Sequence, residues 1–230
     1  MIVPPRLVRG QTIGIAAPSG PVKLDRLRRG LACLGDAFEL RIGASVTAMR
    51  APGTPSYLAA SDEVRIAELN AMLADPDIRA IILARGGYGL MRILPALDPA
   101  LLRHDPKPIV GFSDATALLG WAHHAGVRAI HGPLVVQLAD LPAGDVAQLI
   151  TLLTDPSAPG ERPWSLRSQG RGVHRGPLIA ANLSLASLLV GTPWPLPLAG
   201  AIALLEAVGE RPYELDLDRG VLAILEGAVA

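Results

Sequence analysis

Short apolar runs alternate with helix-like segments through about the first 135 residues, and this alternation restricts the chain to few folds. Apolar runs of this kind are typical of strands that are covered on both faces, and parallel sheets contain such strands. We therefore predict an α/β fold with a doubly wound parallel sheet built from βαβ units. The predicted strands are Thr12–Ala17, Glu39–Ile42, Ala80–Ala84, Pro108–Phe112 and Ala129–His131.

Helix signals fill the intervals between these strands, and two helices have well-marked ends. Ser61 has the side chain of an N-cap for a helix that stops at the Asp-Pro pair at 75–76. A second helix is expected from Asp114 to His124, because Gly126 follows it and glycine is common just past a helix end.

A change in composition divides the chain into two predicted domains. Residues 1–140 are expected to form the α/β domain, and residues 141–176, rich in Pro, Gly, Arg and Ser, to form a linker. Residues 177–230 are expected to form part of a smaller C-terminal domain. Its predicted elements are a helix at Asn182–Val190, a strand at Ala201–Leu205 and a helix at about Leu215–Glu226.

Charge and composition exclude several classes of function. Basic and acidic residues both number 21, so no net field draws the chain to nucleic acid or to an anionic membrane. Cys33 is the only cysteine, which excludes an internal disulfide framework and a cysteine-rich metal site. Pro4 and Arg6 interrupt any signal-peptide core, and no apolar run is long enough to cross a bilayer. We expect a cytoplasmic protein that acts on a small substrate.

Ser113 is the first candidate for chemistry, because it stands where a buried strand turns sharply into a helix. A serine there projects its hydroxyl above the sheet, and the backbone N–H of Asp114 can stabilise an oxyanion. Gly111 leaves room for the turn, although Ala115 replaces the second glycine of the G-x-S-x-G motif. The alternative is that Ser113 only caps the following helix.

A glycine-rich loop follows the strand before Ser113 and leaves the sheet at the same edge, where open α/β sheets bind ligands. In Ala84-Arg-Gly-Gly-Tyr-Gly89, the N–H groups of Gly86 and Gly87 can face a carboxylate or an oxyanion. A plain turn is the alternative. The loop matches neither the P-loop nor the dinucleotide pattern, so we expect no nucleotide cofactor, and no metal site is evident.

Glu206 ends an apolar strand-like run and can orient a catalytic histidine, or it can simply be a solvated strand-end carboxylate. The five histidines offer no evident base. His123 and His124 lie about 15 Å along the helix that starts beside Ser113, and His131 ends a predicted strand, where a backbone-bonded histidine is the alternative.

Several motifs in the same order along the chain resemble the LD-carboxypeptidase family of serine peptidases, which includes murein tetrapeptide carboxypeptidases and microcin C immunity proteins. The motifs extend over essentially the whole chain. They are Ile13-Gly-Ile-Ala-Ala-Pro-Ser19, Ala84-Arg-Gly-Gly-Tyr-Gly89, Val110-Gly-Phe-Ser-Asp-Ala-Thr116, His131-Gly-Pro133, Ala181-Asn-Leu-Ser184, Leu204-Leu-Glu-Ala-Val-Gly-Glu210 and Arg211-Pro-Tyr213.

The resemblance implies a Ser-Glu-His triad in which Ser113 is the nucleophile and Glu206 the acid. It implies cleavage of the amide between meso-diaminopimelate and a terminal D-alanine during peptidoglycan recycling. It also implies a homodimer whose active site lies between the α/β domain and a β-rich C-terminal domain. Arg85 is a candidate for binding the D-alanine carboxylate, with a surface ion pair as the alternative.

The sequence departs from the family pattern in one respect. The family's histidine lies well beyond the glutamate, whereas no histidine follows His174 here. We expect it in a segment beyond residue 230, and a deletion is the alternative. Two other functions stay open. One is an immunity-type amidase, for which Trp121, Trp164 and Trp194 give little support as base-stacking residues, and the other is an inert ligand-binding homologue without the base.

Overall fold

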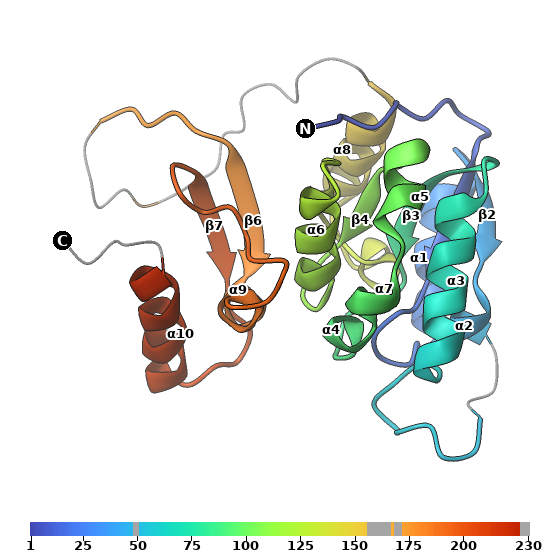
Figure 1. The fold of residues 1–230 in the computed structure, drawn as a ribbon. Coiled ribbons are helices and arrows are strands. Elements are labelled where there is room, and N and C mark those ends of the chain that lie inside the picture. Colours follow the sequence, from blue (N-terminus) through green and yellow to red (C-terminus); the bar gives the residue numbers. More distant parts are fainter. Residues whose placement is uncertain (48–50, 156–166, 168–171, 226–230) are drawn as a thin grey trace.

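A five-stranded parallel sheet forms the centre of the N-terminal part (Figure 1). The structure is a computed structural model, and it describes residues 1–47, 51–155, 167 and 172–225. The strand order is β2-β1-β3-β4-β5. The strands are β1 (Thr12–Ala16), β2 (Glu39–Ile42), β3 (Ile78–Leu83), β4 (Ile109–Gly111) and β5 (Ile130–His131).

Helices cover both faces of this sheet. In Figure 1, α3, α5 and α6 lie in front of the sheet and α1 lies behind it, where it packs against α7. This confirms the predicted parallel α/β architecture. The helices are α1 (Leu24–Gly35), α2 (Ala44–Thr47), α3 (Asp62–Ala74), α4 (Leu90–Ile93), the 3-10 helix η1 (Leu94–Ala96), α5 (Pro99–His104), α6 (Ala115–His124), α7 (Val135–Leu138) and α8 (Ala143–Thr154).

The strand order places a topological switch point between β1 and β3. The chain runs from β1 outward to β2, then crosses back over β1 to β3 and continues in the other direction. The loops that leave the carboxyl ends of β1 and β3 therefore diverge to opposite faces of the sheet. The divergence leaves a crevice between them, and open α/β sheets bind their ligands in crevices of this kind.

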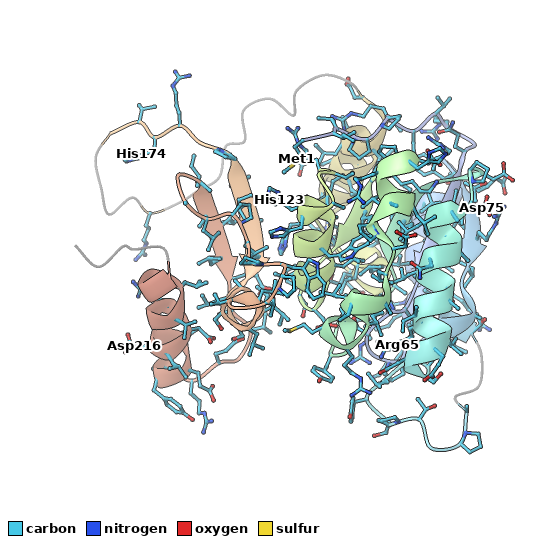
Figure 2. The ribbon with its side chains drawn as sticks, in the orientation of Figure 1. Met1, Arg65, Asp75, His123, His174 and Asp216 are labelled. Atoms are coloured by element: carbon cyan, nitrogen blue, oxygen red, sulfur yellow. The ribbon has the colours of Figure 1, made fainter. Side chains whose placement is uncertain are left out.

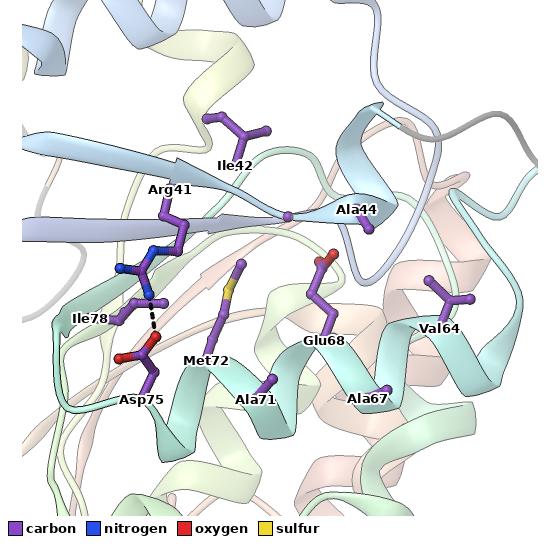
Figure 3. A pocket seen from close by; sticks show the side chains of 11 residues that line it. Arg41, Ile42, Ala44, Val64, Ala67, Glu68, Ala71, Met72, Asp75 and Ile78 are labelled. Carbon is purple, nitrogen blue, oxygen red and sulfur yellow. Dashed lines mark hydrogen bonds and ion pairs between the residues drawn. The ribbon is translucent and has the colours of Figure 1, made fainter.

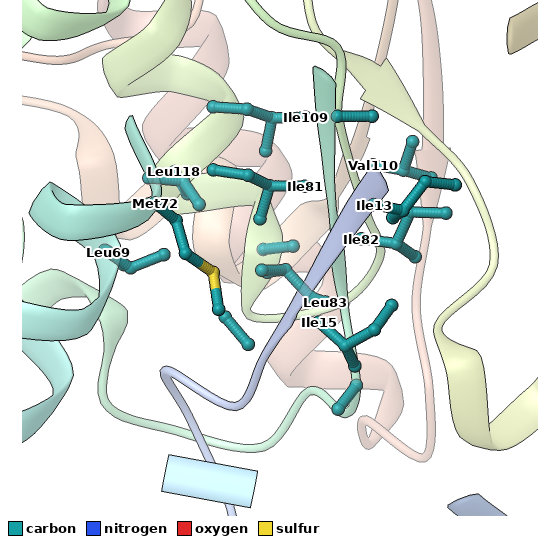
Figure 4. Close-up of a cluster of buried hydrophobic side chains, with 14 of the residues drawn as sticks. Ile13, Ile15, Leu69, Met72, Ile81, Ile82, Leu83, Ile109, Val110 and Leu118 are labelled. Atoms are coloured by element: carbon teal, nitrogen blue, oxygen red, sulfur yellow. The ribbon is translucent and has the colours of Figure 1, made fainter. Parts of the chain in front are cut away.

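The core is aliphatic, and its close packing sets the sheet against α3 and α6. Ile81 on β3 is fully buried, and Figure 4 shows it on the same side as Leu69 and Met72 of α3 and Leu118 of α6. Gly14 on β1 allows α3 to approach, because a Cβ at this position would lie 3.0 Å from Met72 Sδ. Burial on both faces explains why the strands contain uninterrupted apolar runs.

The predicted helix ends match local geometry. The Ser61 side chain accepts a hydrogen bond from Val64 N and caps α3. Gly126 has a φ of +81° just past α6, a conformation that glycine adopts without strain.

The linker prediction for residues 141–176 is wrong over residues 143–154, because these residues form α8. Leu149 and Leu153 of α8 are buried in the main core, and Leu7 N donates to Leu153 O. Two buried leucines are enough to dock the helix, although proline and glycine around it obscure the pattern. Residues 156–166, 168–171 and Glu226, which ends the last predicted helix, lie outside the described residues.

The C-terminal part contains a small second sheet of two parallel strands, and two helices lie beside it. Its own core consists of Ala181, Leu183, Ala186, Leu198 and Leu222. The first of its strands overlaps the start of the helix predicted at Asn182–Val190. The elements are β6 (Leu178–Asn182), α9 (Leu183–Leu189), β7 (Ile202–Glu206) and α10 (Pro212–Leu225).

Candidate active site

Ser113 has a φ of +63°, the one positive value among the described residues other than glycine. A non-glycine residue in this conformation carries about 1–3 kcal/mol of backbone strain, so its surroundings must hold it there. Asp114 occupies the N-cap position of α6, and no side-chain bond caps this helix. Ser113 therefore does not act as a helix cap, and it occupies a sharp turn between β4 and α6 of the nucleophile-elbow kind.

The sequence around Ser113 explains why the chain turns here. A Cβ built on Gly111 would lie only 2.4 Å from the Ala115 Cβ, so residue 111 must be glycine when residue 115 is alanine. The turn then continues through the bond from Thr116 N to Ser113 O, at 2.9 Å. The alanine at position 115, where the motif usually has glycine, thus fits because residue 111 has no side chain.

The glycine-rich loop after β3 lies directly against Ser113. A Cβ on Gly86 would lie 3.1 Å from Ser113 Cβ and 3.3 Å from its Oγ, so only glycine leaves the hydroxyl in place. Gly87 has a φ of +120°. Within the described part of the chain, the N–H groups of Gly86, Gly87 and Asp114 have no hydrogen-bond acceptor. The structure therefore brings together Ser113 and the N–H groups predicted to stabilise an oxyanion.

The Asp114 side chain turns away into the protein and is 1% exposed. Its Oδ2 accepts hydrogen bonds from Ser19 Oγ, at 2.6 Å, and from Leu90 N, at 3.0 Å. Burial raises the pKa of Asp114, and these two donors oppose that shift. No role for this carboxylate was predicted from the sequence.

Arg85 is exposed beside the same loop. Its guanidinium donates to Pro21 O and lies close to Gly20, which in turn donates to Gly86 O at 3.1 Å. Among the described residues Arg85 has no acidic partner, so the alternative of a surface ion pair is not seen there.

Glu206 ends β7 and is half-buried, with Oε1 accepting from Asn182 Nδ2 at 3.0 Å. Asn182 is its register partner on β6. The Asn182 backbone N–H donates to Thr116 Oγ1 at 3.0 Å, and Thr116 N donates to Ser113 O. A chain of hydrogen bonds thus runs from Glu206 to the backbone of Ser113, across the contact between α6 and α9.

Asn182 is a further residue of this site for which no role was predicted from the sequence. It also caps α9, because its Oδ1 accepts from Leu185 N at 3.0 Å. Asparagine just before a helix-like run is a local signal for an N-cap, so the capping role could have been predicted from the sequence. The hydrogen bond to Glu206 could not, because it depends on how β6 pairs with β7.

None of the five histidines forms a hydrogen bond to Ser113 or Glu206 in the described part of the chain. His131 ends β5 and stacks edge-on against Phe112, at 5.3 Å between ring centroids, and burial lowers its pKa. His124 Nε2 contacts Pro195 O at 2.7 Å. Figure 2 shows His123 on the side of α6 that faces the C-terminal part, and exposed His174 far out on that part.

A hollow of about 410 Å³ lies between β2 and α3 (Figure 3). Its charged groups already have partners: Glu68 accepts from Ser45, and Arg41 pairs with Asp75. None of the predicted site residues lines it. The described residues also contain no group of three or more metal-ligating side chains.

Comparison with known proteins identifies the family. The model of the LD-carboxypeptidase N-terminal domain matches residues 13–132, and that of the LD-carboxypeptidase C-terminal domain matches residues 175–222. The chain belongs to the LD-carboxypeptidase family. Ser113 and its elbow lie in the first matched region, and Asn182 and Glu206 in the second.

Two relatives within the LD-carboxypeptidase family carry informative names. The chain is 34% identical to a Streptomyces coelicolor protein that bears the name of a carboxypeptidase, over 94% of this chain and 71% of the relative. It is 36% identical to the murein tetrapeptide carboxypeptidase of Pseudomonas aeruginosa, over 74% of this chain and 58% of that enzyme.

Solved structures confirm the fold. The muramoyltetrapeptide carboxypeptidase of Oxalobacter formigenes matches with a TM-score of 0.81 and 27% identity, covering 93% of this chain and 72% of that one. The microcin C7 self-immunity protein matches with a TM-score of 0.84 and 24% identity, over 99% and 77% of the two chains. No helix in the described residues is long and apolar enough to cross a membrane.

Proposed function

We propose that the protein is a serine carboxypeptidase that cleaves the amide between meso-diaminopimelate and the terminal D-alanine of murein tetrapeptide. The observation that carries this proposal is the positive φ of Ser113 beside Gly86, which presents a hydroxyl next to unpaired N–H groups. The named activity of the Pseudomonas relative supports the substrate class. We further propose that the enzyme acts in the cytoplasm as a homodimer.

The proposed reaction begins with Ser113 Oγ attacking the terminal amide carbonyl, while a histidine oriented by Glu206 takes the hydroxyl proton. None of the five histidines forms a hydrogen bond to Glu206 in the described part of the chain, so the proposal assigns this role to none of them. The N–H groups of Asp114 and of Gly86 or Gly87 stabilise the oxyanion. The histidine returns the proton to the leaving nitrogen, D-alanine departs, and water releases the acyl group from Ser113.

The free carboxylate of D-alanine requires a cationic partner in this scheme, and we assign that part to Arg85. Its exposure and its position beside the glycine-rich loop support the assignment. A guanidinium binds a carboxylate well because its N–H groups form a planar fork.

The test is release of D-alanine from murein tetrapeptide by the full-length protein. Ser113→Ala should lower kcat by roughly 10⁶-fold, as loss of the nucleophile does in serine hydrolases, and leave the thermal midpoint within a few degrees. Ser61→Ala, the same change at the N-cap of α3, should retain activity. Undiminished release by folded Ser113→Ala would disprove the assignment.

The immunity-type amidase has less support as a second function. Trp121 is 2% exposed and lies in the main core, so it cannot stack on a nucleotide base, and Trp194 also packs against that core. Trp164 lies outside the described residues. Faster hydrolysis of a peptidyl nucleotide than of murein tetrapeptide would favour the amidase, and wild-type protein inactive on both would favour the inert ligand-binding homologue.

A further inference from the structure

The buried carboxylate of Asp114 forms no direct ion pair among the described residues, although the buried guanidinium of Arg65 attracts it at longer range. Removing a carboxylate from water costs several kcal/mol, and two hydrogen bonds to one oxygen offset this only in part. Burial raises the pKa of Asp114, and its two hydrogen-bond donors and the charge of Arg65 oppose that shift without cancelling it. A group this costly to bury calls for a reason beyond stability.

The two hydrogen bonds of Asp114 join three loops at the carboxyl edge of the sheet. Ser19 lies in the loop after β1, Leu90 begins α4 just after the glycine-rich loop that follows β3, and Asp114 follows β4. Both donors converge on the same oxygen, Oδ2. One acceptor atom thus fixes the loops on both sides of the switch point relative to the elbow.

Arg65 connects two of these loops a second time. Its side chain is fully buried and reaches from α3 to Pro18 O and to Gly89 O, the latter at 3.0 Å. The bond from Gly20 N to Gly86 O, at 3.1 Å, adds a third tie. The glycine-rich loop is therefore tied to the loop after β1 near both of its ends, at Gly86 through Gly20 and at Gly89 through Arg65.

We infer that the Asp114 carboxylate is a positioning residue, which fixes the Gly86–Gly87 N–H groups relative to the Ser113 hydroxyl. The inference rests on the proposed function, because it concerns the same oxyanion geometry. The negative charge does not itself help, since it would repel a developing oxyanion. What matters is an acceptor at Oδ2, so an asparagine amide oxygen at that place should serve nearly as well.

The test uses a fluorophosphonate, which reports on this geometry without the natural substrate. Ser113 Oγ forms a bond to phosphorus as the P–F bond breaks, fluoride leaves, and the hydroxyl proton passes to the base. The phosphoryl oxygen occupies the oxyanion position. The second-order rate of labelling is measured, together with kcat and KM for D-alanine release per labelled site.

Loss of the acceptor or of a donor should slow labelling and lower kcat without raising KM, because oxyanion contacts act in the transition state. We expect about a 100-fold loss for Asp114→Ala and about a tenfold loss for Ser19→Ala, given that one oxyanion donor is worth roughly 10²–10³-fold. Asp114→Asn should stay within about threefold of the wild type, since it restores the acceptor.

Ser187→Ala is the matched control, because Ser187 is also buried and its hydroxyl donates to a carboxylate, that of Asp218. It should lower the thermal midpoint and leave the labelling rate within about twofold, since Ser187 lies in α9, outside the three loops. If Asp114→Ala does not fold, Ser19→Ala decides the matter. Wild-type labelling rates in Ser19→Ala, or equal losses in Asp114→Asn and Asp114→Ala, would overturn the inference.

The same experiment separates this inference from the proposed function. A wild-type protein that is labelled at Ser113 and releases no D-alanine contradicts only the proposed substrate, and the labelling rates still test Asp114. A wild-type protein that the reagent does not label at Ser113 contradicts the nucleophile, and this inference with it.

Discussion

The two parts of the molecule each place a candidate catalytic residue at the end of a parallel strand, yet they hold it in different ways. Ser113 follows β4, whose residues are all buried within a five-stranded sheet. Glu206 ends β7, whose other residues are exposed in a sheet of only two strands. The elbow is therefore fixed by the core, whereas the acid depends on a few polar contacts.

This difference determines what a mutation can do at each place. Around Ser113 the space is so full that an added methyl group collides with neighbours, so substitutions there change the fold and the chemistry together. Among the described residues, the side chain of Glu206 accepts one hydrogen bond, from Asn182. Substitutions there should change the chemistry and leave the fold nearly unaffected.

Among the substitutions that test this contrast, Glu206→Gln should have the largest effect. The glutamine oxygen can still accept from Asn182 Nδ2, so stability should change by less than about 0.5 kcal/mol, as at other positions outside the core. Loss of the charge that orients and stabilises the histidine should lower kcat by roughly 10⁴-fold. Steady-state D-alanine release and urea unfolding of the same preparation measure the two effects.

Unchanged kcat in Glu206→Gln would remove the acid from the mechanism, and a large loss of stability would break the contrast between the two parts. Glu39→Gln is a control, because Glu39 is an exposed strand glutamate on β2. This variant should behave as the wild type does in both measurements.

The next largest effect is expected for Gly111→Ala at the elbow. Its Cβ would lie 2.4 Å from that of Ala115 and 3.2 Å from Leu83 Cδ1, so overpacking should cost about 3 kcal/mol, and Ser113 should be displaced. Urea unfolding and fluorophosphonate labelling should both respond. The double variant Gly111→Ala/Ala115→Gly relieves the first clash and should recover about half of the lost stability, despite glycine in a helix.

Equal stability of the single and double variants would show that the contact between positions 111 and 115 does not shape the turn. A stable single variant with the labelling rate of the wild type would show that the core does not fix the elbow. Either result would weaken the contrast with Glu206.

The sequence predicted the main sheet and the elbow because their signals are local. Buried strands such as β3 are continuous apolar runs, and Ser113 stands between such a run and a helix. The sequence did not predict β6, which pairs only with β7, or α8, which buries just two leucines. These depend on partners distant in the chain.

The candidate site also contains a part that could be predicted from the sequence and a part that could not. Gly86 and Ser113 could be assigned to one edge of the sheet, because carboxyl ends of parallel strands meet there. The bonds from Ser19 to Asp114 and from Asn182 to Glu206 span 95 and 24 residues, and no local pattern encodes them. Only the folded register brings these groups within reach.

Asn182→Asp should have an intermediate effect on the chemistry of the C-terminal part. Aspartate still caps α9 by accepting from Leu185 N, but it has no N–H to donate to Glu206. A hydrogen bond to a charged group is worth about 1.5–3 kcal/mol, so kcat should fall by roughly 10- to 100-fold. The new carboxylate also faces that of Glu206, so like-charge repulsion should lower the thermal midpoint although the cap remains.

Asn182→Ala is the matched comparison, since it removes both the cap and the donor. It should lose about 1 kcal/mol of stability in addition to the fall in kcat. If Asn182→Asp keeps the wild-type kcat, the bond to Glu206 plays no part in orienting the acid.

The smallest expected effect concerns the contact that joins the two parts. Thr116 is 1% exposed, and its hydroxyl accepts from the backbone N–H of Asn182. Thr116→Val keeps the shape of the side chain and leaves that buried N–H without an acceptor, which should cost about 1–2 kcal/mol in urea unfolding. Thr116→Ser keeps the hydroxyl and loses one methyl group, so it should cost about 1 kcal/mol at most.

Because Thr116 is linked to both Ser113 and Asn182, the valine variant should also lower kcat about threefold, whereas the serine variant should not. Equal stability and equal kcat in the two variants would mean that the nucleophile and the acid are aligned by packing between α6 and α9 alone.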